Sequence, residues 1–310
     1  MLAMLVGAGF AKWAVHLPVA SQLFDFNIDP WGVREVQKLE TVKSLKQTWD
    51  EKHPDGLAEQ FIADALNFQE KSREVVLWYL ARRLCEPFIW QEFHSHKWRR
   101  HVLMIDEERR FKVAGIVKAQ SFIMKFYGPS LGGIITTNYD MTIEYALGTK
   151  LFNYGIANQA LIGRGPYPVS TWLKPVTLKG KVPLAKIHGS ISRDENAYYT
   201  EGRRGLTGKA LIVAPTPEKQ PPPSLEFEWE LATRILKRST CLIVFGFAFN
   251  PYDEAVLNLL KNSGSNIRSV LLIDIDPNIE RVRQLWPDIE ITACLPPPDG
   301  NVAIRDWAIS

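Results

Sequence analysis

The sequence has few cysteines and no long apolar run, and both absences exclude classes of protein. Its three cysteines, Cys85, Cys241 and Cys294, are far apart and form no C-x-x-C pair. Such a set excludes a four-cysteine zinc site and is typical of a reducing compartment. No apolar stretch approaches the roughly 18 residues that span a bilayer, and no basic segment precedes the first apolar run. We therefore expect a cytoplasmic protein with no membrane contact.

The charge of the chain is nearly balanced. A net charge of +3 is too small to indicate nucleic-acid binding, and the basic segments at 97–101 and 107–112 are typical of solvated helix faces. We do not expect direct binding to nucleic acid. The 310 residues, 46% of them hydrophobic, suffice for one large or two modest globular domains.

Two kinds of apolar pattern divide the chain. From about residue 50 to residue 128, apolar residues recur at steps of three and four, which predicts a helical insertion or cap. We assign residues 1–49 and 129–310 to one α/β domain, because apolar runs there alternate with helical segments. Continuous Val, Ile and Leu runs are typical of parallel strands buried on both faces, so we predict a Rossmann-like parallel sheet. The later runs are 132–137, 183–188, 209–215, 240–247 and 269–276.

A pair of glycines follows the first apolar run, at residues 2–6. Gly7 and Gly9 let the backbone turn tightly and approach a ligand, and the N-terminus of a helix after such a turn attracts phosphate. The third glycine of a G-x-G-x-x-G motif is replaced by Lys12, so the ordinary Rossmann fingerprint is broken. The pair is compatible with a phosphate loop or with a tight structural turn. In a phosphate loop, a β-branched side chain at Gly9 would fill the space where the backbone approaches phosphate.

Polar or glycine residues also follow the later apolar runs. In open parallel sheets, ligands bind beyond the carboxyl ends of the strands. Each of these residues alone also fits a structural role, as a turn former, a hydrogen-bonded loop residue or a helix cap. Together they predict one crevice. They are Thr137, Asn138, Asp140, His188, Gly246, Asn250, Asp253, Asp274 and Asp276.

The order of these motifs resembles the Sir2 fold. The chain is similar to the Sir2-like NAD-hydrolase domains of bacterial antiphage defence systems, rather than to the protein deacetylases. The motifs are G-A-G at 7–9, T-T-N-Y-D at 136–140, K-I-H-G-S at 186–190, F-G-F-x-F-x-x-x-D at 245–253 and a strand with an acidic end at 269–276.

The resemblance implies a role for individual residues. Asn138 and His188 match the catalytic pair of the family, and Asp140 matches their partner in the N-x-D motif. Asp274 or Asp276 would lie near the adenosine ribose of NAD. The other residues implied in NAD binding are Gly7, Ala8, Gly9, Phe10, Ala11, Thr137, Gly246 and Phe247.

The chemistry of these side chains suits cleavage of NAD. Breaking the bond between nicotinamide and ribose builds positive charge on the ribose, so the site must orient water or a hydroxyl and accept a proton. His188 can take a proton near neutral pH, and Asn138 can accept and donate a hydrogen bond at once. Because the cysteines of the family's zinc ribbon are missing, we expect no zinc and favour hydrolysis of NAD to nicotinamide and ADP-ribose.

One departure from the family pattern supports an alternative. The pattern usually has serine two residues after G-A-G, where this chain has Ala11. The chain could therefore be a non-catalytic NAD or ADP-ribose-binding regulatory module, and a deacylase built without zinc is a third possibility.

An enzyme that depletes NAD must be silent until it is triggered. The resemblance implies a homo-oligomer or a partner protein of a defence system, for example an ATPase or an Argonaute-type sensor. The helical block from 50 to 128 is either the surface for this partner or a cap over the pocket. Its aromatic residues include Phe61, Phe68, Trp78, Phe88, Trp90 and Trp98.

Overall fold

A computed structural model describes the fold of most of the chain. The described residues are 1–30, 32–93, 107–155, 167–168, 181–194, 197–198, 208–215 and 221–309. Trp98, expected at a partner surface, lies outside these ranges, and so do the side chains of Phe88 and Trp90.

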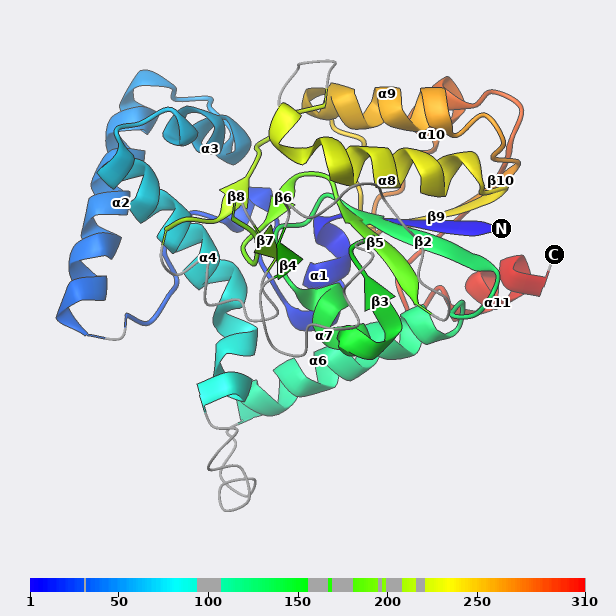
Figure 1. Ribbon diagram of the computed structural model, residues 1–310, viewed down its shortest axis with the longest axis horizontal. Coiled ribbons are helices and arrows are strands. Elements are labelled where there is room, and N and C mark those ends of the chain that lie inside the picture. Colours follow the sequence, from blue (N-terminus) through cyan, green and yellow to red (C-terminus); the bar gives the residue numbers. More distant parts are fainter. Residues whose placement is uncertain are drawn as a thin grey trace.

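A seven-stranded parallel sheet, formed by the described residues, is the centre of the fold (Figure 1). Its strand order is β11-β10-β9-β1-β2-β5-β3, so the first strand of the chain lies in the middle. This sheet confirms the predicted α/β, Rossmann-like fold class. The strands are β1 (Leu2–Val6), β2 (Leu131–Thr136), β3 (Phe152–Asn153), β5 (Val182–Lys186), β9 (Cys241–Phe245), β10 (Ser269–Ile273) and β11 (Glu290–Cys294).

Helices cover both faces of the sheet (Figure 1). Successive side chains of a strand point to opposite faces, so Met4 and Val6 of β1 join one core, while Ala3 and Leu5 join the other. The first core includes α1 (Ala8–Val15), α6 (Glu107–Met124), α7 (Thr142–Leu151) and α11 (Asn301–Ile309). The second includes α8 (Glu226–Lys237), α9 (Glu254–Ser263) and α10 (Ile279–Leu285).

The apolar run at 209–215 was wrongly predicted as a strand of the parallel sheet. Only β8 (Leu211–Ile212) forms there, and it pairs antiparallel with β6 (Gly189–Ser190) in a separate small sheet. An apolar run does not identify its partner strand, and here the partner is the segment directly after β5. The pattern also missed β11, whose residues are only partly buried and lack a continuous apolar signature. A further antiparallel pair joins β4 (Tyr167–Pro168) to β7 (Ala197–Tyr198).

Three more helices lie beside the sheet, on its left in Figure 1. They are α2 (Val33–Lys52), α3 (Ala58–Leu66) and α4 (Glu70–Phe93), and they bury apolar clusters largely of their own. The helices of this block therefore begin at Val33, before the residue at which the apolar periodicity begins. By contrast, α6 lies within the predicted insertion but packs against α1 in the sheet layers. The division into two domains stays a prediction. Within the described parts of the chain, every helix is too short or too polar to cross a membrane.

Candidate active site

A cavity of about 800 Å³ lies at the carboxyl ends of the central strands. Residues from the segments after β1, β2, β5, β9 and β10 line it, as expected for ligand sites of open parallel sheets. The structure thus brings together twelve of the residues named from the sequence. They are Ala8, Gly9, Ala11, Thr137, Asn138, Asp140, His188, Gly246, Phe247, Asn250, Asp253 and Asp274.

Three other predicted site residues, Phe10, Gly7 and Asp276, are not among the residues that line the cavity. Phe10 is fully buried in the core, with its ring against that of Phe245 at a centroid distance of 5.1 Å. Gly7 meets the site through its carbonyl group only, which accepts a hydrogen bond from Asn138. Asp276 is exposed outside the cavity, and its backbone amide donates to Asp274 Oδ1 at 3.3 Å. Of the two acidic residues, the structure therefore places Asp274 at the cavity.

The glycine pair packs against the loop that follows β9. Gly9 donates its amide to the carbonyl of Gly246 at 3.0 Å, and Gly7 donates to Phe245 at 2.9 Å. A Cβ added at Gly9 would lie 2.7 Å from Gly246 Cα, and one at Gly246 would lie 2.4 Å from the nitrogen of Phe10. Gly246 also has a φ of +65°, which side chains disfavour. The glycines are therefore required for this close approach of two loops, and a valine at Gly9 would meet protein backbone.

Asn138 is held in one orientation. Its Nδ2 donates to the carbonyl of Gly7 at 2.9 Å, and its backbone amide donates to Thr136 Oγ1 at 3.0 Å. Since a carbonyl oxygen only accepts, the amide nitrogen must face Gly7, which leaves Oδ1 to accept a hydrogen bond from another group. The residue is 9% exposed and lines the cavity. No described residue donates to Oδ1, so this acceptor is available to a water or a ribose hydroxyl.

His188 forms a pair with Asp253. The distance from His188 Nε2 to Asp253 Oδ1 is 3.1 Å, and the two side chains are only 6% and 10% exposed. A neutral imidazole has one N–H, and donation from Nε2 to the carboxylate leaves Nδ1 as the proton acceptor. Asp253 ends the short helix η7 (Pro251–Asp253), which Asn250 caps by accepting the amide of Tyr252 at 3.0 Å. The sequence placed both residues at strand ends, but it contained no signal for their contact.

The side chains of Asp140 and Tyr139 form hydrogen bonds that hold the loop after β2 in place. Asp140 Oδ1 accepts the amide of Thr142, the first residue of α7, at 2.8 Å. Tyr139 donates its hydroxyl to the carbonyl of Val213 at 3.1 Å. Burial, and then the charges of Asp253 and Glu59, raise the pKa of the Tyr139 phenol far above its ordinary value. Tyr139 therefore stays protonated. The observed contact of Asp140 is structural, so its catalytic role stays a prediction.

The charges around the cavity are mostly negative. Five carboxylates line it, and Lys12 is the one lysine or arginine among the described lining residues. Lys12 stands where the Rossmann motif has its third glycine, and it was not predicted as a site residue. Glu59 was also missed, because it lies on α3, far from the strand ends in sequence. The carboxylates are Glu59, Asp140, Asp253, Asp274 and Asp299.

The loop after β11 also lines the cavity. Leu295, Pro296 and Pro297 line it, and Trp13 of α1 donates its indole N–H to the carbonyl of Pro297 at 2.7 Å. No motif pointed to these residues, because β11 itself was not predicted. Among the residues that the structure describes, no group of three or more His, Cys, Asp or Glu side chains could hold a metal ion.

A family model for the SIR2-like domain matches residues 132–294, more than half of the chain. The chain belongs to the SIR2-like family. The match contains the segments with Asn138, His188, Asp253 and Asp274, and it confirms the Sir2-like part of the resemblance drawn from the motifs. It begins at β2, but the structure adds β1 and its glycine loop to the middle of the same sheet. Domains of this family use NAD. No protein of curated function matches the chain.

Proposed function

We propose that this SIR2-like protein is an NAD glycohydrolase, which cleaves the bond between nicotinamide and ribose to give nicotinamide and ADP-ribose. The observation that carries this proposal is that Asn138 and the His188–Asp253 pair line the same cavity. An oriented acceptor and a proton-accepting imidazole are the groups that hydrolysis at C1′ requires.

The chemistry assigns each group one task. Nicotinamide leaves as a neutral molecule with the electrons of its bond to C1′, and the ribose becomes positively charged. Asn138 Oδ1 accepts a hydrogen bond from water and holds it for attack on C1′. His188 accepts the proton that the water or a ribose hydroxyl loses, while Asp253 orients the ring and stabilises its charged form. The carboxylates of Asp253 and Glu59 favour the positive charge on the ribose.

The remaining lining residues suit the rest of NAD. The N-terminus of α1, after Gly7, has the positive end of the helix dipole for the diphosphate, and Lys12 adds a charge beside it. The amide of Gly9 is engaged with Gly246, so it contributes less to this site than the sequence indicated. Asp274 suits the hydroxyls of the adenosine ribose, next to the apolar segment at 295–297.

Turnover by the purified protein tests the proposal. NAD is incubated with wild type, Asn138→Ala and His188→Ala, and nicotinamide release is measured by chromatography. Positioned acid–base groups contribute about 10²–10⁴-fold, so each variant should lose that much activity while keeping its melting temperature within a few degrees. If His188→Ala kept nearly full activity, the mechanism would be wrong.

Ala11 favours the alternative of a regulatory module that binds NAD or ADP-ribose without cleaving it. The side chain lines the cavity and has no hydroxyl for the ligand. Calorimetric binding of ADP-ribose to a wild-type protein that releases no nicotinamide, alone or with a partner, would support this alternative.

We further propose that the enzyme acts in antiphage defence, gated by self-assembly or by a partner protein. Three residues of the helical block, Glu59, Ile62 and Leu84, line the cavity, which supports a cap that a partner could shift. Light scattering with and without NAD, combined with turnover, tests gating. A monomer that is fully active alone would contradict it.

A further inference from the structure

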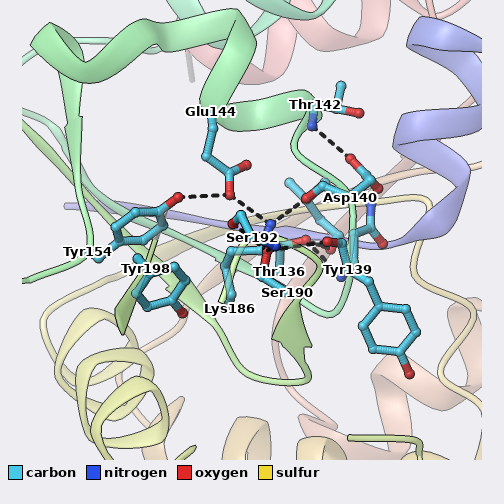
Figure 2. A network of polar contacts seen from close by, with 12 residues as sticks. Thr136, Tyr139, Asp140, Thr142, Glu144, Tyr154, Lys186, Ser190, Ser192 and Tyr198 are labelled. Carbon is cyan, nitrogen blue, oxygen red and sulfur yellow. Dashed lines mark hydrogen bonds and ion pairs between the residues drawn. The ribbon is translucent and has the colours of Figure 1, made fainter. Parts of the chain in front are cut away.

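A buried ion pair lies close to two of the segments that line the proposed active site. Lys186 is the last residue of β5, two residues before His188, and it is fully buried. Its Nζ lies 2.8 Å from Glu144 Oε1 of α7 and also donates to the backbone carbonyl of Asp140 (Figure 2). The lysine therefore connects the segment of His188 to the loop that carries Asn138.

Backbone contacts connect the same two segments. The carbonyl of Tyr139 accepts the amide of Ile191 at 3.0 Å and the hydroxyl of Ser190 at 3.3 Å. The carbonyls of residues 139 and 140 thus both accept from the segment 186–191. Asn138 directly precedes these anchored positions, so their placement determines where its side chain lies relative to His188.

A charged group is a costly way to satisfy one carbonyl. Moving an ammonium and a carboxylate out of water costs several kcal/mol for each ion, and a neutral donor would satisfy the Asp140 carbonyl at a smaller cost. The long side chain of the lysine can span the distance from the sheet to the loop, and its ion pair fixes the direction of the ammonium group. Glu144, the partner in this pair, in turn accepts a hydrogen bond from Tyr154 at 3.1 Å.

We propose that Lys186 is a positioning residue for NAD cleavage, and that its ammonium, held by Glu144, sets the placement of Asn138 against His188 through the Asp140 carbonyl. This inference rests on the proposed function for its effect on turnover. Its structural part, the anchoring of the loop, is measured separately. Misplacing a reacting group by about 1 Å can lower the rate about 100-fold.

The fold contains a matched control pair. Arg193 Nε lies 2.8 Å from Glu228 Oε1, and both side chains are 2% exposed. Tyr198 donates to this carboxylate at 3.0 Å and stacks on Tyr154 at a centroid distance of 3.8 Å. The guanidinium donates to the carbonyl of Ser224, whereas Lys186 donates to the loop of Asn138. Both are buried pairs of a cation and a carboxylate that accepts from a tyrosine, and they differ in the segment whose carbonyl the cation contacts.

The experiment compares two double variants, Lys186→Met with Glu144→Gln and Arg193→Met with Glu228→Gln. Each removes both charges of one pair, since removing one partner alone leaves a buried charge without its counter-charge and is strongly destabilising. Each also keeps an acceptor for the neighbouring tyrosine. Both are measured for melting temperature, for kcat and KM with NAD, and for hydrogen exchange of the peptide at 137–142.

We expect the first variant to lower kcat about 10- to 100-fold, with KM changed less than about threefold, and to speed exchange at 137–142. The control should keep kcat within about threefold and leave this exchange unchanged. Equal kcat losses in both variants, or an unchanged kcat in the first, would overturn the positioning role. If wild type cleaves no NAD, either alone or with a partner, the proposed function fails, and the exchange data still decide whether Lys186 anchors the loop.

Discussion

Replacing Asp253 with asparagine would remove the charge beside His188 and keep the shape of the side chain. In the structure, His188 Nε2 lies 3.1 Å from Asp253 Oδ1 in a nearly buried position. Asparagine has one oxygen and one NH₂ group in place of the two carboxylate oxygens. Its oxygen can still accept from Nε2, but without the negative charge that stabilises a protonated imidazole.

The magnitude follows from the hydrogen bond to a charged group that is lost. A hydrogen bond to a charged group contributes about 1.5–3 kcal/mol, which corresponds to about 10- to 150-fold in rate. If the NH₂ group of the introduced asparagine turned toward Nε2 instead, Nδ1 would carry the hydrogen and could no longer accept a proton. In serine proteases such a change of tautomer costs about 10⁴-fold. We therefore expect Asp253→Asn to lower kcat at least about tenfold.

The assay measures nicotinamide release, and calorimetry measures the binding of ADP-ribose, which should change less than about threefold because the change affects the reacting centre. A suitable control is Asp64→Asn, because Asp64 Oδ2 accepts the indole N–H of Trp49 at 2.7 Å in the helical block. In this control, the same substitution changes the acceptor of a ring N–H outside the catalytic pair. A kcat of Asp253→Asn within about twofold of wild type would refute the role given to the pair.

Other predictions concern the glycine loop and the buried tyrosines. Ala11→Ser should tighten ADP-ribose binding by about tenfold at most, since one hydrogen bond adds about 0.5–1.5 kcal/mol, and calorimetry showing a hundredfold gain would contradict this. Gly9→Val should destabilise the fold by about 1–3 kcal/mol in urea denaturation, because its Cβ would lie 2.7 Å from Gly246 Cα. An undiminished stability would show that the two loops separate easily. Burial, and then nearby carboxylates, raise the pKa of Tyr154 and Tyr198 well above the ordinary value. The contribution of each protonated tyrosine to the free energy of unfolding is complete below about pH 10, and it declines above this pH by about 1.4 kcal/mol per pH unit. Tyr154→Phe should therefore flatten the loss of stability between about pH 10 and 11.

Much of the fold and part of the candidate site followed from local pattern. Continuous apolar runs predicted β1, β2, β5, β9 and β10, because a strand covered by helices on both faces has little room for polar side chains. The carboxyl ends of parallel strands meet at one edge, so Asn138 and His188 could be placed in one crevice from the sequence alone.

Contacts between distant segments were decided by the tertiary structure alone. The sequence contains both His188 and Asp253, but only the tertiary structure brings η7 close to the segment after β5 and places a carboxylate 3.1 Å from the imidazole. The choice of Asp274 over Asp276 depends on how the chain turns after β10. The run at 209–215 forms an antiparallel pair because the strand that lies beside it in the folded chain is β6. Periodicity reports which face of an element is buried, whereas the partner of a buried group depends on three-dimensional distances that no local pattern contains.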